Sequence, residues 1–290
     1  MLSLLSRKLR ACLAGAGLAG ILAVSLTAGG SAVANDRPYL AVGDSVPFGF
    51  IFQAGFAYIN PDNFVGYPAY VGNARDFRTF DTACPGETTS HFISTSGADN
   101  GCGAYHGPFP LHVSYTGAQL AHATAFLSAH PNTKLVSVQL GANDGFLLQK
   151  SCGGIPSCII AHLPALLATV STNMDTILKA LHATHFHGVL MVVNYYSLDY
   201  ADAAGTVLTS ALNGAIASHA AADGAVVADV FSAFQTAAST VFAAHHTCKA
   251  GLLNANPTNP LLCDVHPSQS GHELIAETIG KAYNAAASDE

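Results

Sequence analysis

Five short apolar runs, separated by segments of helical periodicity, constrain the fold of this chain more than any other feature of its sequence. The runs cover residues 39–42, 77–80, 135–140, 189–193 and 225–230, and the helical segments cover 118–129, 163–181, 207–221 and 268–287. Continuous apolar runs are typical of strands that are buried on both faces of a parallel sheet. Strands that alternate with helices predict an α/β fold, a three-layer α/β/α sandwich around a mostly parallel five-stranded sheet.

The first 34 residues have the pattern of a secretory signal peptide. Basic residues within 7–10 precede an apolar run over 11–27, and the segment 32–34 reads Ala-Val-Ala, with small side chains at the positions that precede cleavage. We therefore expect residues 1–34 to be removed and residues 35–290 to form one domain, secreted to the extracellular space or the periplasm. The alternative is an uncleaved membrane anchor, which is disfavoured because the Ala- and Gly-rich run is only weakly apolar.

Acidic residues outnumber basic ones. Lysine and arginine total 11 against 18 aspartates and glutamates, and three of the bases lie in the segment that we expect to be removed. The remaining chain lacks the basic surface that binds nucleic acid or attaches a protein to anionic lipid. With 50% hydrophobic and only 10% charged residues, the composition also excludes a disordered protein. We expect no nucleic-acid partner and no stable membrane insertion after cleavage.

An even number of cysteines follows the N-terminal segment, which is typical of a disulfide set in an exported protein. These cysteines are Cys84, Cys102, Cys152, Cys158, Cys248 and Cys263. Six cysteines allow fifteen pairings, but these fall into three pairs that are local in sequence, and we predict that nearest neighbours are bonded. Zinc binding is the competing interpretation. It is disfavoured because no C-x-x-C occurs and because exported thiolates tend to pair with each other.

Four polar segments lie at predicted strand ends or ahead of a predicted helix. They are Gly43-Asp44-Ser45, Cys84-Pro85-Gly86-Glu87-Thr88-Thr89, Gly141-Ala142-Asn143-Asp144 and Asp264-Val265-His266-Pro267. The first three follow the first three predicted strands, and the fourth precedes the final helix. Each segment alone is a weak signal, because short polar segments often only cap helices. Together they lie at one edge of the predicted sheet, where open α/β sheets bind their ligands.

In this order, the segments resemble the serine, glycine, asparagine and histidine blocks of the SGNH, or GDSL, hydrolase family. The resemblance covers essentially the whole chain after residue 34. It is closest to secreted bacterial lipases and esterases of this family, whose glycine block often reads Ala-Cys-Pro-Gly-Glu-Thr and which carry three local disulfides. The G-x-S-x-G elbow of the α/β-hydrolases is absent from the sequence, which argues against that other class of serine hydrolase.

The resemblance implies a role for each block. Ser45 would be the nucleophile and His266 its base, because a serine hydroxyl attacks effectively only when an imidazole removes its proton. The backbone N–H groups of Ser45 and Gly86 and the side-chain amide of Asn143 would bind the oxyanion of the tetrahedral intermediate. The resemblance implies no metal and no organic cofactor.

The acid of the catalytic set is left open. The family usually places it three residues before the histidine, where this chain has Cys263, whereas Asp264 stands only two residues before. Either Asp264 reaches the Nδ1 proton of His266 through a tighter turn, or the main-chain carbonyl of Cys263 accepts that proton, as a carbonyl does in some related esterases. We favour Asp264. Its non-catalytic interpretation is a surface acid near a helix N-terminus.

The resemblance therefore predicts a secreted serine carboxylic ester hydrolase, a lipase or esterase, whose partner is a small-molecule or lipid ester. One alternative is a polysaccharide O-deacetylase or acyltransferase with the same machinery, and another is a catalytically inactive binding module. Retention of all four blocks argues against the inactive module, because a pure binder has no physical need for oxyanion donors. The acyl chain and the alcohol depend on loop shape, which the sequence does not specify, and the oligomeric state is equally unspecified.

Other residues lead to weaker expectations. We expect the aromatic side chains of residues 48–58 to belong to the core, with a role in an acyl pocket as the alternative. We also expect His272 to face solvent. Two histidine pairs are expected at the surface rather than on a metal, because no further ligand stands at a suitable spacing; these are His185 with His187 and His245 with His246.

Overall fold

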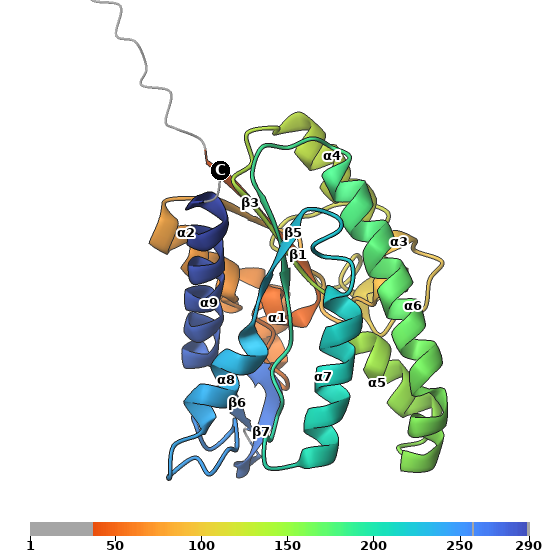
Figure 1. Ribbon diagram of the computed structural model, residues 1–290, viewed down its shortest axis with the longest axis vertical. Helices are drawn as coiled ribbons and strands as arrows, with labels where there is room; N and C mark the ends of the chain where they lie inside the picture. Colours follow the sequence, from red (N-terminus) through yellow and green to blue (C-terminus); the bar gives the residue numbers. More distant parts are fainter. Residues whose placement is uncertain (1–36, 257, 289–290) are drawn as a thin grey trace, which may run out of the picture. The chain divides into compact units, whose positions relative to one another are not determined.

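The computed structural model describes residues 37–256 and 258–288, so the expected signal peptide lies outside the described residues. Five parallel strands form a sheet in the order β2-β1-β3-β4-β5 (Figure 1). They are β1 (Pro38–Gly43), β2 (Arg78–Asp81), β3 (Leu135–Gln139), β4 (Val189–Val193) and β5 (Ala225–Ala228). Each strand overlaps a predicted run, and the predicted α/β/α fold is confirmed.

Helices cover both faces of the sheet (Figure 1). On one face α9 (Gln269–Ser288) packs against α2 (Tyr67–Arg75) and α8 (Val230–Ala238), and on the other α6 (Pro156–His182) packs against α4 (Gln119–Ala129) and α7 (Ala203–Ala217). Strands β1 and β3 are buried along their whole length, and Leu127, Met174 and Ile279 from the covering helices are fully buried. This burial on both faces explains why the strand sequences are continuous apolar runs.

Several elements have no counterpart in the sequence analysis. They are α1 (Ser45–Phe48), α2, α3 (Thr89–Ile93), α5 (Ala142–Ser151), α8, the 3₁₀ turns η1 (Gly55–Ile59), η2 (Pro61–Asn63) and η3 (Cys102–Ala104), and a hairpin of β6 (Leu253–Asn256) with β7 (Asn259–Pro267). The helices among them are too short for a hydrophobic period to stand out. The hairpin is antiparallel, with Leu253 opposite Pro267.

Two predicted helices differ in extent from the observed ones. α6 begins at Pro156 rather than at residue 163. Proline is well tolerated in the first turn of a helix, because the N–H that it lacks would have no hydrogen-bond partner there. α7 is displaced toward the N-terminus and spans Ala203–Ala217. It begins there because the Asp202 side chain accepts the N–H of Ala204 at 3.1 Å and caps the helix.

Three disulfides join the predicted nearest neighbours: Cys84–Cys102, Cys152–Cys158 and Cys248–Cys263. The first holds the segment that contains Gly86, and the third holds β7 immediately before Asp264. Their sequence separations of 18 and 15 residues would each contribute about 3 kcal/mol in the chain-entropy model of crosslinks. The longer crosslinks therefore stabilise the two loops that carry site residues.

Candidate active site

Ser45 lies at the carboxyl end of β1, where the chain turns sharply into α1. The turn requires Gly43, which has a φ of 146° and whose added Cβ would lie 2.3 Å from the carbonyl oxygen of Gln139. Asp44 then caps α1, because its carboxylate accepts the N–H of Val46 at 2.9 Å. Ser45 is thus presented in the first turn of α1, at the sheet edge expected from the sequence.

His266 lies near the end of β7 and faces Ser45. Its Nε2 is 2.9 Å from the Oγ of Ser45, and its Nδ1 is 2.8 Å from Oδ1 of Asp264. The ring of Phe50 packs edge-on against the imidazole, with 4.9 Å between the ring centroids. The fold therefore joins three of the predicted site residues in one hydrogen-bonded chain, although Ser45 and His266 are 221 positions apart in the sequence.

The carboxylate of Asp264 accepts two backbone N–H groups in addition to the imidazole. Phe52 donates its N–H to Oδ2 at 2.8 Å, and the N–H of His266 reaches Oδ1 at 3.3 Å. Burial alone would raise the pKa of Asp264, but these hydrogen bonds and the charge of His266 hold the pKa below its ordinary value. An ionised carboxylate, rather than the Cys263 carbonyl, therefore faces Nδ1 of His266 in the structure.

Gly86 lies on the loop that follows β2, and Asn143 lies in the first turn of α5, which follows β3. Gly86 has a φ of 87°, and a Cβ there would lie 2.8 Å from the backbone of Asn100, so the position requires glycine. The Nδ2 of Asn143 donates to Asp44 Oδ2 at 3.3 Å, while its Oδ1 accepts from Nδ2 of Asn100 at 2.8 Å. These two contacts fix the amide so that its N–H side points toward the Ser45 turn.

Buried polar side chains hold the loops of the site together. Gln119 accepts the N–H of Gly43 at 2.7 Å and donates to the Gly43 carbonyl at 3.1 Å and to Glu87 at 3.2 Å. Asp144 accepts the N–H and the hydroxyl of Thr89 at 2.9 and 2.6 Å, which ties α5 to α3. Gln119 carries no sequence signal of this role, because it lies at the start of α4 and outside every motif.

Asp44 is fully buried and accepts a hydrogen bond from Tyr195. The Tyr195 hydroxyl donates to Oδ2 at 2.5 Å. Burial raises the pKa of Asp44 from 3.8 to about 6, and the hydrogen bonds from Tyr195 and Val46 limit that rise. Tyr195 was also missed, although it follows β4, and the rule that ligand-binding residues follow parallel strands could have found it.

Asp44→Asn is expected to make the stability of the fold less dependent on pH. Because folding raises the pKa of Asp44 from 3.8 to about 6, the folded state holds this proton more tightly than the unfolded state. Protonation of Asp44 therefore adds to the free energy of unfolding. This addition is complete below about pH 4 and is lost as the pH rises through about 6. From about pH 4 to 7.5, the free energy of unfolding of the variant should therefore rise relative to wild type by up to about 3 kcal/mol.

Urea unfolding of both proteins at the two pH values measures this change. Asp62→Asn, which removes an exposed carboxylate, is the matched control and should leave the pH dependence as it is in wild type. The expectation would be contradicted if the difference in the free energy of unfolding between Asp44→Asn and wild type were the same at both pH values.

A pocket of about 320 Å³ opens beside Ser45, between α5, α6 and α7, and Asn143 and His266 also line it. Most of its other lining residues are apolar, namely Val46, Ala142, Phe146, Leu148, Ile159, Leu163, Leu166, Leu198, Leu208, Leu212 and Val265. None of the aromatic residues of 48–58 lines this pocket. Phe48 instead lies in a separate buried cluster with Phe64, against which Phe50 and Tyr58 pack. Phe52 and Phe56 are exposed, so the core expectation holds for only part of the segment, and the pocket alternative does not hold.

His272 is buried, which corrects the expectation that it faces solvent. Only 3% of its surface is exposed, and it shares the buried face of α9 with Ile275 and Ile279. Burial lowers the pKa of His272 to about 3, so its ring is neutral near neutral pH. The spacing of 272, 275 and 279 follows the helical period, and that signal was sufficient to place His272 in the core.

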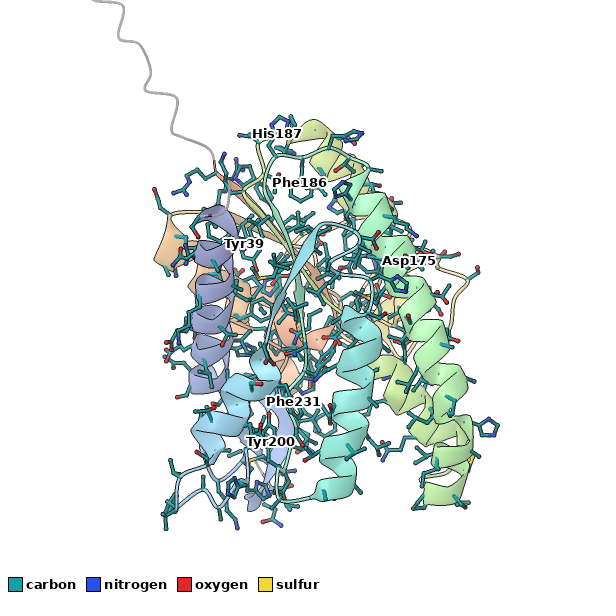
Figure 2. The ribbon with its side chains drawn as sticks, in the orientation of Figure 1. Tyr39, Asp175, Phe186, His187, Tyr200 and Phe231 are labelled. Atoms are coloured by element: carbon teal, nitrogen blue, oxygen red, sulfur yellow. A yellow bond between two sulfur atoms is a disulfide. The ribbon has the colours of Figure 1, made fainter. Side chains whose placement is uncertain are left out.

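Groups of metal-type ligands occur at three places in the described ranges 37–256 and 258–288. Two of them depend on sulfurs of the Cys84–Cys102 disulfide, which offer no thiolate to a metal. The third consists of Asp175, His219 and Asp223. Asp175 projects from α6 (Figure 2), and its Oδ2 is already 2.7 Å from the Nζ of Lys179. None of these groups includes a residue of the serine–histidine–aspartate chain.

Solved structures with the same fold include several hydrolases. A phospholipase A1 from Streptomyces albidoflavus NA297 is 21% identical, with a TM-score of 0.53, and the alignment covers 85% of this chain and 99% of that one. An acetylxylan esterase from Geobacillus stearothermophilus is 14% identical, with a TM-score of 0.53 and coverage of 85% and 94%. An α/β hydrolase enzyme from the metagenome of Lake Arreo, Spain, is 15% identical, with a TM-score of 0.54 and coverage of 86% and 96%. At these identities the likeness shows the fold.

Family membership is shown by the sequence. The model of the GDSL-like Lipase/Acylhydrolase family matches residues 41–274, a span that contains all the site residues described above. No curated protein matches the chain. Because the matched span is most of the chain, and because the blocks that suggested this family from the sequence lie within it, the chain belongs to the GDSL-like lipase/acylhydrolase family, whose members are hydrolases that act on ester bonds.

Proposed function

We propose that this chain is a serine carboxylic ester hydrolase in which Ser45 is the nucleophile, His266 the base and Asp264 the acid that orients the base. The observation that carries the proposal is the hydrogen-bonded chain from Ser45 Oγ through both ring nitrogens of His266 to Asp264, with distances of 2.9 and 2.8 Å, beside an apolar pocket. Nucleophile, base and orienting group lie within hydrogen-bond reach of one another, which is what acyl transfer requires.

The reaction steps follow from this geometry. As the Oγ of Ser45 bonds to the ester carbonyl carbon, its proton passes to Nε2 of His266, and Asp264 stabilises the imidazolium through Nδ1. When the tetrahedral intermediate collapses, the bond to the alcohol oxygen breaks, and that oxygen leaves with the proton from Nε2. Water then attacks the acyl-serine while Nε2 of His266 removes its proton. As the bond between the acyl carbon and Oγ breaks, that proton passes to Oγ, which restores Ser45 and releases the carboxylic acid.

The negative charge of the tetrahedral intermediate needs donors that are already in place. In the proposal these are the backbone N–H groups of Ser45 and Gly86 and the Nδ2 of Asn143. The contacts of Asn143 with Asp44 and Asn100 support this role, because they orient the amide without needing the substrate. Donors fixed before the reaction stabilise the transition state without reorganising during the chemical step.

Asn143→Ala is expected to lower kcat by about a hundred- to a thousandfold with little change in KM. The amide binds the oxyanion better than the ground-state carbonyl, so its loss falls on the chemical step. Steady-state kinetics with a soluble p-nitrophenyl ester measure both constants. Asn284→Ala, which removes an exposed amide on α9, serves as the control. An effect confined to KM would assign Asn143 to substrate binding instead.

The pocket supports an acyl chain longer than acetyl as the preferred substrate group. Its volume of about 320 Å³ is much larger than an acetyl group, and apolar side chains line most of it. Each methylene buried there would contribute about 0.8 kcal/mol, or roughly fourfold in kcat/KM. A lipid or other long-chain ester therefore suits the site better than acetylated polysaccharide.

A panel of p-nitrophenyl esters from acetate to palmitate, with acetylated xylan as the contrasting substrate, tests this function. We expect kcat/KM to rise from acetate through the longer chains until the pocket is filled, and xylan to be a poor substrate. A preference for acetate together with release of acetate from xylan would favour the O-deacetylase alternative. Labelling with a fluorophosphonate probe tests the inactive-module alternative, because a module without an activated serine would stay unlabelled.

We also propose that residues 1–34 are a cleaved signal peptide and that residues 35–290 form a single secreted catalytic domain. The three disulfides are compatible with secretion, since such bonds persist in oxidising compartments. N-terminal sequencing of the protein collected from the culture medium or periplasm tests both the export and the cleavage site.

A further inference from the structure

Large exposed apolar side chains of this protein gather at one end of the sheet. Of the fourteen that are exposed in the described part of the chain, ten lie between the carboxyl end of a strand and the second turn of the long helix that crosses back, namely α2, α6 or α7, two follow α8, and one lies in β7. These are Ile51, Phe52, Phe56, Ile59, Val65, Phe146, Ile155, Ile160, Leu198, Val207, Val241, Phe242 and Leu262, and the exception is Val227 within β5. Single exposed apolar residues are ordinary, but such a concentration marks a surface that is covered in use.

The first half of α6 is the most unusual part of this end. No Asp, Glu, Lys or Arg occurs between Lys150 and Asp175, and the helix is apolar and long enough to span a bilayer. Yet only 11% of its most apolar 18-residue stretch is buried in the protein. All of its fully buried residues, from Val170 onward, lie in the second half. A helix that is apolar on all sides is normally enclosed by a protein core or by lipid, and here protein encloses only half of it.

The two sides of this helix half face different surroundings. Ile159, Leu163 and Leu166 line the pocket next to Ser45, whereas Ile160 is 65% exposed. The neighbouring α7 repeats the arrangement: it contains no charged residue, its Leu208 and Leu212 line the pocket, and its Val207 is 66% exposed. The pocket is therefore flanked by the first half of α6 and by α7, neither of which contains Asp, Glu, Lys or Arg. Ile160 and Val207 are the large apolar side chains on their outer sides, beside small side chains and the polar His162 and Ser210. In Figure 1 both helices extend toward the end of the molecule where β6 and β7 lie.

The opposite end of the sheet is different. His187, labelled at the top of Figure 2, precedes β4, whereas Tyr200 and Phe231, which follow β4 and β5, lie toward the apolar end. None of the large exposed apolar side chains lies in the segments 130–134, 183–188 and 218–224, which lead into the amino ends of β3, β4 and β5. The asymmetry places the apolar surface on the side of the molecule to which the Ser45 pocket belongs.

Charge indicates the kind of partner. After residue 34 the chain has eight Lys and Arg residues and eighteen Asp and Glu residues, so a strongly anionic surface would repel it. Continuity with the pocket indicates a lipid rather than a protein partner. A protein bound across α6 and α7 would cover the pocket that contains the proposed nucleophile, whereas a lipid aggregate is itself the source of the ester. A lipid molecule could pass from it into the pocket without crossing water.

We infer that the exposed side chains beside the pocket, Phe146, Ile155, Ile160, Leu198 and Val207, form a docking face that binds the surface of an uncharged or zwitterionic lipid aggregate and delivers its ester to Ser45. This inference rests on the proposed esterase function and specifies its substrate as aggregated lipid. The apolar side chains enter the boundary between headgroups and acyl chains, as those of interfacial helices do. Binding then follows from apolar burial, without the basic residues on which attachment to anionic lipid depends.

Vesicle binding by a catalytically silent protein is the first test. Ser45→Ala, mixed with phosphatidylcholine vesicles, should co-float with them, and binding to vesicles rich in phosphatidylglycerol should be weaker. Adding the three changes Ile155→Gln, Ile160→Gln and Val207→Gln should lower the partition coefficient by about a hundredfold, because three apolar side chains no longer enter the lipid. Adding Val227→Gln instead, which removes an exposed aliphatic side chain from β5, should leave binding unchanged.

Activity on two physical forms of substrate is the second test. With Ser45 retained, the triple glutamine variant should hydrolyse soluble p-nitrophenyl butyrate at a rate within about twofold of the wild-type rate. None of the three substituted residues lines the pocket. Its rate on phosphatidylcholine vesicles should fall on the order of a hundredfold, in line with its binding. Thermal unfolding monitored by circular dichroism checks that the triple variant is folded. If it is not, Ile160→Gln alone replaces it, and its rate on phosphatidylcholine vesicles should fall by about tenfold.

The outcomes separate the docking face from the proposed chemistry. Wild type that hydrolyses no ester would refute the proposed function, while binding by Ser45→Ala would still report on the docking face. The inference is overturned if Ser45→Ala does not bind phosphatidylcholine, if binding requires anionic lipid, or if the triple variant binds as tightly as its parent. It is also overturned if size-exclusion chromatography shows a dimer that the triple substitution dissociates, because the face would then join two copies of the chain.

Discussion

Ser45→Ala is expected to lower kcat for ester hydrolysis by about 10⁵- to 10⁶-fold while the protein remains folded. The substitution removes the oxygen that would form the acyl bond, and the hydroxyl's interaction with Nε2 of His266, at 2.9 Å, is lost with it. The small residual rate would come from the pocket and the oxyanion donors, which the substitution leaves in place. Turnover of a soluble p-nitrophenyl ester, with the circular dichroism spectrum as a check on folding, measures the effect.

A second substitution tests whether serine and histidine act as a unit. His266→Ala should be about as damaging as Ser45→Ala, and the double variant should be scarcely slower than either single one, because each loss already disables the same step. Ser96→Ala, which removes an exposed hydroxyl from the loop after α3, should retain wild-type activity. Activity near wild type in folded Ser45→Ala would exclude the proposed mechanism, and two losses that multiply would show that the residues act independently.

Asp264→Asn is expected to lower kcat by about 10⁴-fold. The asparagine has nearly the same shape and retains an oxygen that can accept the N–H of Phe52, but it cannot stabilise a positive imidazolium. Its NH₂ group can also donate to Nδ1 of His266, which would leave the proton on Nε2, where it blocks acceptance of the Ser45 proton. The same soluble ester assay measures the loss, which should fall on kcat rather than on KM.

This variant also decides between the two acceptors for the Nδ1 proton that the sequence left open. If the Cys263 carbonyl were the functional partner of His266, Asp264→Asn would change kcat by less than about tenfold, far from the effect of removing a catalytic acid. Asp62→Asn provides a control for the loss of one negative charge at an exposed site. The low pKa of Asp264 supports the carboxylate, because it is ionised throughout the pH range in which His266 could act as a base.

The sheet and the order of the site segments could be predicted because their signals are local. Strands buried on both faces are continuous apolar runs, and β1 and β3 show this along their whole length. Gly43 and Gly86 could be noticed because a positive φ beside close backbone leaves little choice of residue. In contrast, the strands of the β6–β7 hairpin are rich in Asn and Pro and show no clear alternation, so no local pattern predicts them.

The partners that hold the site could not be predicted in the same way. Gln119 contacts Gly43 from 76 positions away and Tyr195 contacts Asp44 from 151 positions away, so neither contact leaves a pattern in neighbouring residues. His272 is a different case, because the helical period of α9 did mark it as part of the buried face. The expectation that His272 faces solvent followed from the polarity of histidine and not from its position in the helix.

By itself the sequence determined the alternation of strands and helices and the sheet edge at which Ser45, Gly86, Asn143 and His266 gather, because hydrophobic period and turn chemistry act over a few neighbouring residues. Only the tertiary structure decided that the Asp264 carboxylate faces Nδ1 of His266, and that the pocket lies between α5, α6 and α7 rather than among the aromatic residues after Ser45. Both outcomes depend on how distant segments pack against each other, and close packing fixes such contacts through shapes that no local pattern encodes.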